Sequence, residues 1–130
     1  MEQRKKIMII DDNLIDQMIT AHVLKSNNTT NEDLLIMENA YLALDYLEAN
    51  KNNLNAMPSL ILLDLDMPGM SGYEFLQHYK NFSQEIKSLC RIIVLTGSDI
   101  QADIDRVEAD PYVSKLITKP LSKNQLIPML

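Results

Sequence analysis

The sequence predicts an α/β fold, a three-layer (βα)5 doubly wound sandwich around a parallel five-stranded sheet. Short apolar runs alternate with longer amphipathic stretches, and this order is typical of right-handed strand–helix–strand crossovers. The apolar runs are continuous rather than alternating with polar residues, as strands covered on both faces require. The chain has 130 residues, so we expect residues 1–130 to form a single domain.

The first three expected strands are short runs rich in isoleucine and leucine. They lie at residues 7–10, 34–37 and 60–63, the last of them after Pro58. Between the first two strands, a helix is indicated by apolar residues that recur at helical spacing, namely Leu14, Ile15, Met18, Ile19 and Val23. A second helix is expected at residues 40–49, before the third strand.

The second half of the chain continues this alternation. Pro68 and Gly69 break the chain, and a helix is expected after them at residues 72–80. The remaining elements are a strand, a helix, a weaker strand and a last helix, expected at residues 92–95, 100–109, 113–117 and 122–130. Asp99 can cap the helix that begins at Ile100.

Composition and charge argue against several classes of protein. Lys and Arg number 12 and Asp and Glu 18, and a net charge of −6 argues against direct binding to nucleic acid, which relies on basic residues. Cys90 is the single cysteine, so no internal disulfide can form and a reducing compartment is indicated. The first apolar run is too short for a signal peptide or a membrane span, so we expect a cytoplasmic protein with no membrane partner.

Polar residues follow the expected strands at one edge of the sheet, where open parallel sheets form their sites. These residues are Asp11, Asp12, Asp64, Asp66, Thr96 and Lys119. Taken singly, such residues are more often helix caps and loops, and only their shared placement predicts a site. Gathered carboxylates repel one another, and a hard cation such as Mg²⁺ relieves this. A lysine can bind a phosphoryl oxygen, and an Asp carboxylate can accept a phosphoryl group as an acyl phosphate.

The run at residues 64–72, Asp-Leu-Asp-Met-Pro-Gly-Met-Ser-Gly, resembles the phosphoacceptor motif of bacterial response regulator receiver domains. The pairs Asp11-Asp12, Thr96-Gly97 and Lys119-Pro120 match further motifs of that family, in the family's order. The resemblance extends from residue 6 to residue 126. It implies a flavodoxin-like fold with strand order 2-1-3-4-5.

The resemblance also implies a role for each site residue. Asp64 resembles the phosphoacceptor, and Thr96 and Lys119 resemble the residues that contact the phosphoryl oxygens. The implied Mg²⁺ ligands are Asp12 directly, Asp11 mainly through water, Asp64, and the backbone carbonyl of Asp66. The family often has a cis peptide before a proline, which here is the bond between Lys119 and Pro120.

The resemblance implies a phosphorylation-controlled switch in a two-component phosphorelay. The implied partner is a sensor histidine kinase or a histidine phosphotransfer protein, and the downstream protein target is left open. Such a domain is not an enzyme beyond its own phosphorylation and dephosphorylation. Two alternatives stay open, a phosphohydrolase of the haloacid dehalogenase type and a protein-binding module that works without phosphorylation.

Two residues depart from the family's commonest pattern. Leu116 stands where receivers usually carry an aromatic residue or histidine that rotates on activation. We therefore expect phosphorylation to rearrange residues 97–100 and the first turn of the following helix, while Leu116 keeps one rotamer. Asp66 adds a negative side chain to a site that is already acidic.

Overall fold

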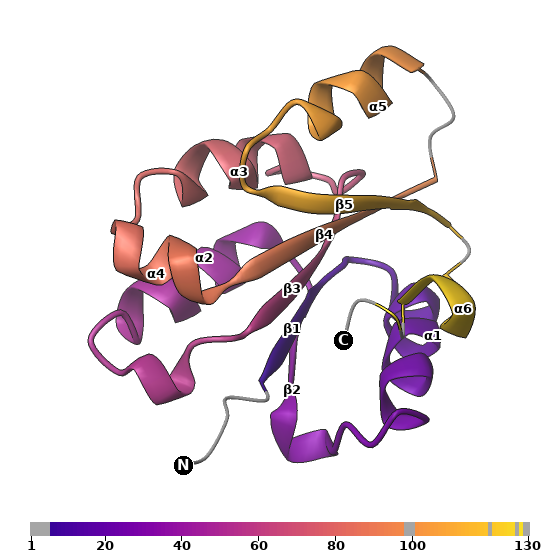
Figure 1. Cartoon of the computed structure of the whole chain (residues 1–130), viewed down its shortest axis with the longest axis horizontal. Coiled ribbons are helices and arrows are strands. Elements are labelled where there is room, and N and C mark those ends of the chain that lie inside the picture. The colour runs from indigo at the N-terminus through magenta and orange to yellow at the C-terminus, as the bar shows by residue number, and fades with distance from the viewer. Residues whose placement is uncertain (1–5, 98–100, 120, 127, 129–130) are drawn as a thin grey trace.

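The computed structural model describes residues 6–97, 101–119, 121–126 and 128, and it confirms the predicted fold class. A five-stranded parallel sheet has the order β2-β1-β3-β4-β5. Its strands are β1 (Ile7–Ile10), β2 (Leu34–Met37), β3 (Leu60–Asp64), β4 (Arg91–Thr96) and β5 (Val113–Thr118). Because all strands run in the same direction, their carboxyl ends lie along one edge of the sheet (Figure 1).

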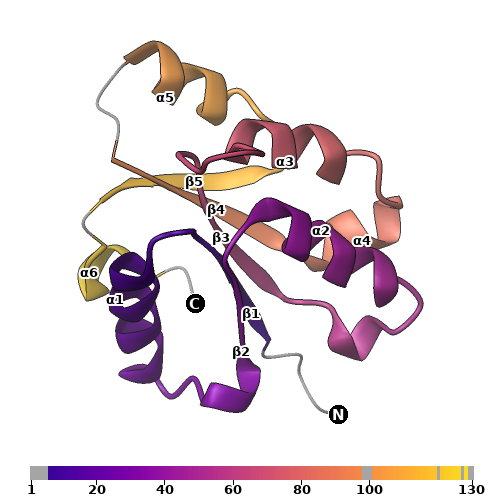
Figure 2. The same ribbon diagram turned by 180° about the vertical axis from the view of Figure 1, so that it is seen from behind.

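Helices cover both faces of the sheet, which makes three layers (Figures 1 and 2). The helices are α1 (Leu14–Lys25), α2 (Ala40–Ala49), α3 (Gly72–Tyr79), α4 (Gln84–Leu89), α5 (Gln101–Glu108) and α6 (Lys123–Leu126). Buried residues of α1 and α6 pack on one face, and buried residues of the other four helices pack on the opposite face. No helix of the described residues is long and apolar enough to cross a bilayer.

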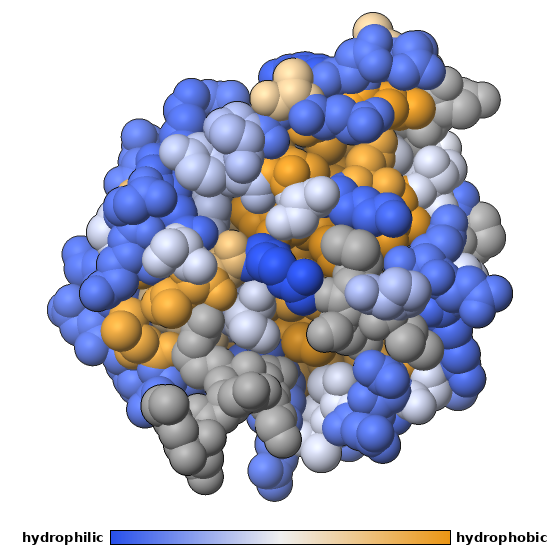
Figure 3. Space-filling model, in the orientation of Figure 1, coloured by the Kyte–Doolittle hydropathy of each residue, from blue (hydrophilic) through white to orange (hydrophobic). Residues whose placement is uncertain are grey.

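The core consists of two apolar layers, one on each side of the sheet. In β1, Met8 and Ile10 point into one layer, while Ile7 and Ile9 point into the other. This division explains why the strands are continuously apolar, since each side chain of a doubly covered strand is buried. On the surface that Figure 3 shows, apolar residues gather in the middle and hydrophilic residues form the rim.

The structure differs from the sequence-based expectations in a few elements. Helix α4 was not predicted from the sequence. Ser83 is a local signal for its start, since the Ser83 side chain accepts a hydrogen bond from the Ile86 amide in the first turn. The last expected helix is observed as α6, which ends at Leu126 within the described residues. The predicted cap at Asp99, the cis peptide at Pro120 and part of the loop at residues 97–100 lie outside the described residues.

The apolar stripe of α1 predicted the helix correctly, but most of the stripe lies on the surface. Leu14, Ile15, Met18 and Ile19 are between 40% and 68% exposed, whereas Val23 is buried. We refer to these four exposed residues as the α1 apolar surface. Ile15, Met18 and Ile19, together with Leu121, also line an open groove of about 640 Å³.

Candidate functional site

Three predicted carboxylates meet at the carboxyl edge of the sheet. Asp11 and Asp12 follow β1, and Asp64 is the last residue of β3, which lies next to β1. One carboxylate oxygen from each residue lies within 4.8 Å of the others. Asp11 and Asp64 are buried, while Asp12 is exposed, so the cluster opens to solvent on one side.

Hydrogen bonds from the backbone hold the two buried carboxylates in place. The amide of Asn13 donates to Oδ1 of Asp11 at 2.9 Å, and the amide of Asp66 donates to Oδ1 of Asp64 at 3.2 Å. The Gln17 side chain donates to the Asp11 carbonyl at 2.6 Å and ties this segment to α1. The carboxylates are therefore oriented by the chain before any ligand binds.

Lys119 brings a positive charge to this cluster. Its Nζ lies 3.2 Å from Oδ2 of Asp11 and 3.4 Å from Oδ1 of Asp64. The Lys119 amide donates to the Thr96 carbonyl at 2.7 Å, which joins the end of β4 to the residue after β5. Thr96 is itself buried at the end of β4, so the structure brings together Asp11, Asp12, Asp64, Thr96 and Lys119 at adjacent strand ends.

Burial and like charge make the ionised form of Asp64 costly. Burial, and then the charge of Asp11, raise the pKa of Asp64 to about 6, although Lys119 and the Asp66 amide oppose the shift. Burial alone would lower the pKa of Lys119, but Asp16, Asp64 and Asp11 outweigh burial and raise it above its ordinary value. The cluster thus holds an excess of negative charge that one ammonium group only partly offsets.

The donor set of the cluster fits a hard divalent cation. Carboxylate oxygens are the ligands that Mg²⁺ prefers, and this ion usually keeps several waters and binds only one or two carboxylates. Asp12 offers an exposed oxygen, and the buried oxygens of Asp11 and Asp64 lie within reach of the same point. Asp66 has an exposed side chain, and the role of its backbone carbonyl as a ligand stays a prediction.

The loop between β3 and α3 is shaped by its glycines. Gly69 has φ of +77°, a conformation that side chains with Cβ rarely adopt. A Cβ atom on Gly72 would lie 2.7 Å from the Asp64 carbonyl oxygen and 2.8 Å from Cα of Leu65. The start of α3 can therefore lie directly against the backbone of Asp64 and Leu65 only because residue 72 is glycine.

One residue of the site was not predicted from the sequence. Asp16 of α1 lies 2.8 Å from Nζ of Lys119, closer than either buried carboxylate. The local signal was weak, because Asp16 reads from the sequence as an acidic residue in the first turn of a helix, a common position for such residues. The partner lysine, moreover, is 103 residues away in the sequence.

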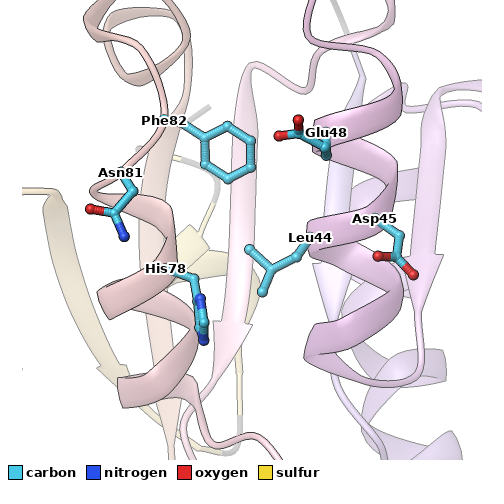
Figure 4. Close-up of a pocket in the computed structure, with 6 residues that line it drawn as sticks. All are labelled: Leu44, Asp45, Glu48, His78, Asn81 and Phe82. Carbon is cyan, nitrogen blue, oxygen red and sulfur yellow. The ribbon is translucent and has the colours of Figure 1, made fainter.

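A separate pocket of about 280 Å³ lies between α2 and the end of α3 (Figure 4). Leu44 and Phe82 point toward each other across it, and Glu48 and His78 lie at its sides. It shares no residue with the carboxylate cluster. We therefore assign it no part in the chemistry of the site.

Comparison with known proteins gives a consistent result. The response regulator receiver domain family matches residues 7–130. A two-component response regulator of Arabidopsis thaliana is 30% identical over 127 residues, which cover 93% of this chain and 79% of that protein.

Solved structures agree with the sequence comparison. A two component response regulator from Cytophaga hutchinsonii has the same fold, with a TM-score of 0.86 at 23% identity over 98% of this chain and 95% of that one. The Mn²⁺-bound form of the response regulator Rcp1, known from Synechocystis, has a TM-score of 0.74 at 28% identity. That match covers 96% of this chain and 88% of the other.

Proposed function

Because this chain belongs to the response regulator receiver domain family, we propose that it accepts a phosphoryl group on Asp64. Members of this family act in phosphorylation-controlled two-component signalling, and this is the function of the chain. The family assignment does not favour a haloacid dehalogenase-type phosphohydrolase or a module that works without phosphorylation. The observation that supports Asp64 as the acceptor is its burial at the end of β3, with Nζ of Lys119 3.4 Å away and Asp11 and Asp12 beside it.

In the proposed reaction, a carboxylate oxygen of Asp64 attacks the phosphorus of a phosphohistidine on the partner. The new O–P bond makes an acyl phosphate, the N–P bond breaks, and its electron pair stays on the imidazole nitrogen. Lys119 and the hydroxyl of Thr96 donate hydrogen bonds to the phosphoryl oxygens. Positioning and charge neutralisation carry most of such a transfer, so a small site suffices.

We assign the cation site to Asp11, Asp12, Asp64 and the backbone carbonyl of Asp66. A bound Mg²⁺ would neutralise charge on the phosphoryl oxygens and on the carboxylates. Receiver domains bind Mg²⁺ or Mn²⁺ at an acidic pocket, and the related Mn²⁺-bound structure agrees with this. The choice of Mg²⁺ for this chain is our proposal, and it rests on the all-oxygen donor set.

The partner we propose is a sensor histidine kinase or a histidine phosphotransfer protein. It must bring an imidazole to Asp64, so its surface must cover residues beside the site. The α1 apolar surface fits this need, because it begins two residues after Asp12 and exposes Leu14 and Ile15 by 68% and 67%. We further propose that residues 1–130 act as one receiver domain and catalyse only their own phosphorylation and dephosphorylation.

Intact-protein mass spectrometry tests the acceptor. The chain is incubated with acetyl phosphate and Mg²⁺, alongside Asp64→Asn and the control Asp45→Asn, an exposed substitution on α2. We expect the wild type and Asp45→Asn to gain the mass of one phosphoryl group, and Asp64→Asn to gain none. Equal modification of wild type and Asp64→Asn would refute the assignment.

A further inference from the structure

The nearest carboxylate to Lys119 is not one of the buried site acids but Asp16 of α1. The Lys119 Nζ lies 2.8 Å from Asp16, 3.2 Å from Asp11 and 3.4 Å from Asp64. Nζ donates hydrogen bonds to Asp11 and to Asp16. The ammonium group is therefore shared among three carboxylates and lies nearest to the one in the first turn of α1.

The position of Asp16 is set by the local structure of α1. Its amide donates to the side chain of Asn13, which caps the helix, at 3.0 Å. This cap fixes the first turn, so the Asp16 carboxylate is held at the edge of the site. The side chains of Asp16 and Lys119 are 33% and 19% exposed, so water screens this pair less than a pair on the open surface.

We propose that Asp16 is a positioning residue that competes with the phosphoryl group for Lys119. The inference rests on the proposed function, in which Lys119 donates to the phosphoryl oxygens on Asp64. When a phosphoryl group is present, the ammonium must weaken its contact with Asp16 in order to approach the new oxygens. The carboxylate of Asp16 also repels an incoming anion directly. Both effects act in the same direction and disfavour the phosphorylated state.

Removal of this carboxylate should therefore strengthen binding of a phosphoryl mimic. Beryllofluoride serves as the probe, at a saturating concentration of Mg²⁺, and fluorine NMR measures its apparent affinity. We expect Asp16→Asn to bind about twofold to fivefold more tightly than wild type, the range that a partly exposed ion pair supports. Asp16→Glu keeps the carboxylate and should restore an affinity close to that of wild type.

A matched control separates the contact with Lys119 from a general change of charge. Glu38 follows β2 at the same edge of the sheet, is exposed, and forms no ion pair with Lys119 in the described residues. Glu38→Gln should therefore change the affinity by less than about twofold, because exposed charges at a distance are screened. In metal-free protein, the side-chain NMR signals of Lys119 should shift in Asp16→Asn and stay in place in Glu38→Gln.

The outcomes distinguish this inference from the proposed function. If Asp16→Asn binds beryllofluoride no more tightly than wild type, while its amide spectrum shows an intact fold, the competition does not exist. An equal gain in affinity for Glu38→Gln would also overturn it, since charge alone would then explain the effect. If the wild-type chain itself fails to bind beryllofluoride with Mg²⁺, the proposed function fails instead.

Discussion

At the scale of single residues, the site is governed by the cost of keeping carboxylates charged at a buried strand end. Asp64 is 4% exposed and shares its surroundings with Asp11, which is 1% exposed. A carboxyl group in this position favours its protonated form until a cation or an ammonium group compensates the charge. Lys119 supplies part of that compensation, and a divalent cation would supply more.

The raised pKa of Asp64 leads to a pH dependence of stability. The pKa is about 6 in the folded chain and ordinarily 3.8, so the folded state binds this proton more tightly than the unfolded state. The contribution of Asp64 to stability is therefore favourable at low pH and is lost as the pH rises from about 4 through about 6. In metal-free buffer, we expect Asp64→Asn to be more stable than wild type at pH 7.

Urea unfolding of both proteins across this range measures the effect. The gain in the free energy of unfolding for Asp64→Asn should shrink as the pH falls from 7 toward 4, because wild-type Asp64 becomes protonated. Titrating groups far from Asp64 cancel in the comparison, since both proteins contain them in the same surroundings. A gain that does not change between pH 4 and pH 7 would contradict the assigned shift.

At the scale of elements, the junction of β3 and α3 determines how closely the strand that ends at Asp64 meets the following helix. The Gly72 amide donates to the Leu65 carbonyl at 3.0 Å, and Ser71 and Glu74 form a capping box at the start of α3. The buried side chains of Met67 and Met70 hold the loop against the core. The chain that follows Asp64, the proposed acceptor, is thus a packed turn rather than a free loop.

Substitution of Gly72 tests this junction. The added methyl group of Gly72→Ala meets backbone atoms of Asp64 and Leu65, which cannot move aside cheaply. We expect a loss of about 1–3 kcal/mol in the free energy of unfolding, as for other overpacked sites, measured by chemical denaturation. Gly97→Ala is the control, since a Cβ at Gly97 meets no atom of the described residues within 4 Å, and it should cost much less. Equal losses for the two variants would argue against close packing at Gly72.

Helix α5 packs on the core through a buried valine and contacts α3 through a tyrosine. Its buried residue is Val107, and the hydroxyl of Tyr73 on α3 donates to the Asp103 carbonyl at 3.3 Å. The guanidinium of Arg106 lies 4.0 Å from the centre of the Tyr73 ring. Tyr73 therefore links α3, which follows the loop after β3, to α5, which follows β4.

Loss of this link should loosen α5 selectively. Tyr73→Leu removes both the ring and the hydroxyl, and we expect faster amide hydrogen exchange in α5 and a loss of about 1 kcal/mol in stability. Tyr73→Phe keeps the ring under Arg106 and should show a smaller effect. Exchange in β1 and β3 serves as the internal reference. If α5 exchanges at the same rate in all three proteins, Tyr73 does not anchor this helix.

At the scale of the whole molecule, the parallel sheet is what assembles the site. Strands β1, β3, β4 and β5 lie side by side and run the same way, so the residues that follow them meet at one edge. The helices of both faces then bury the strands and leave that edge open to solvent. The α1 apolar surface lies beside the open edge, where an incoming protein could reach both.

Much of this arrangement could be predicted from the sequence, because its signals are local. The apolar runs placed β1 and β2 with the observed bounds and the other strands to within one residue at each end. The predicted site residues Asp11, Asp12, Asp64, Thr96 and Lys119 meet as expected, since strand order and direction bring their strand ends together. Helix α4 escaped prediction because it is short and has a weak apolar pattern.

The sequence by itself therefore determined the fold class, the strand positions and the edge where the site forms. Only the tertiary structure decided that Lys119 contacts Asp16 most closely, that the α1 apolar surface faces outward, and that the pKa of Asp64 rises. The reason is physical: periodicity and strand ends are properties of neighbouring residues. Burial, charge pairing and exposed faces depend instead on contacts between segments as far apart as Asp16 and Lys119, and the chain makes those contacts only when it folds.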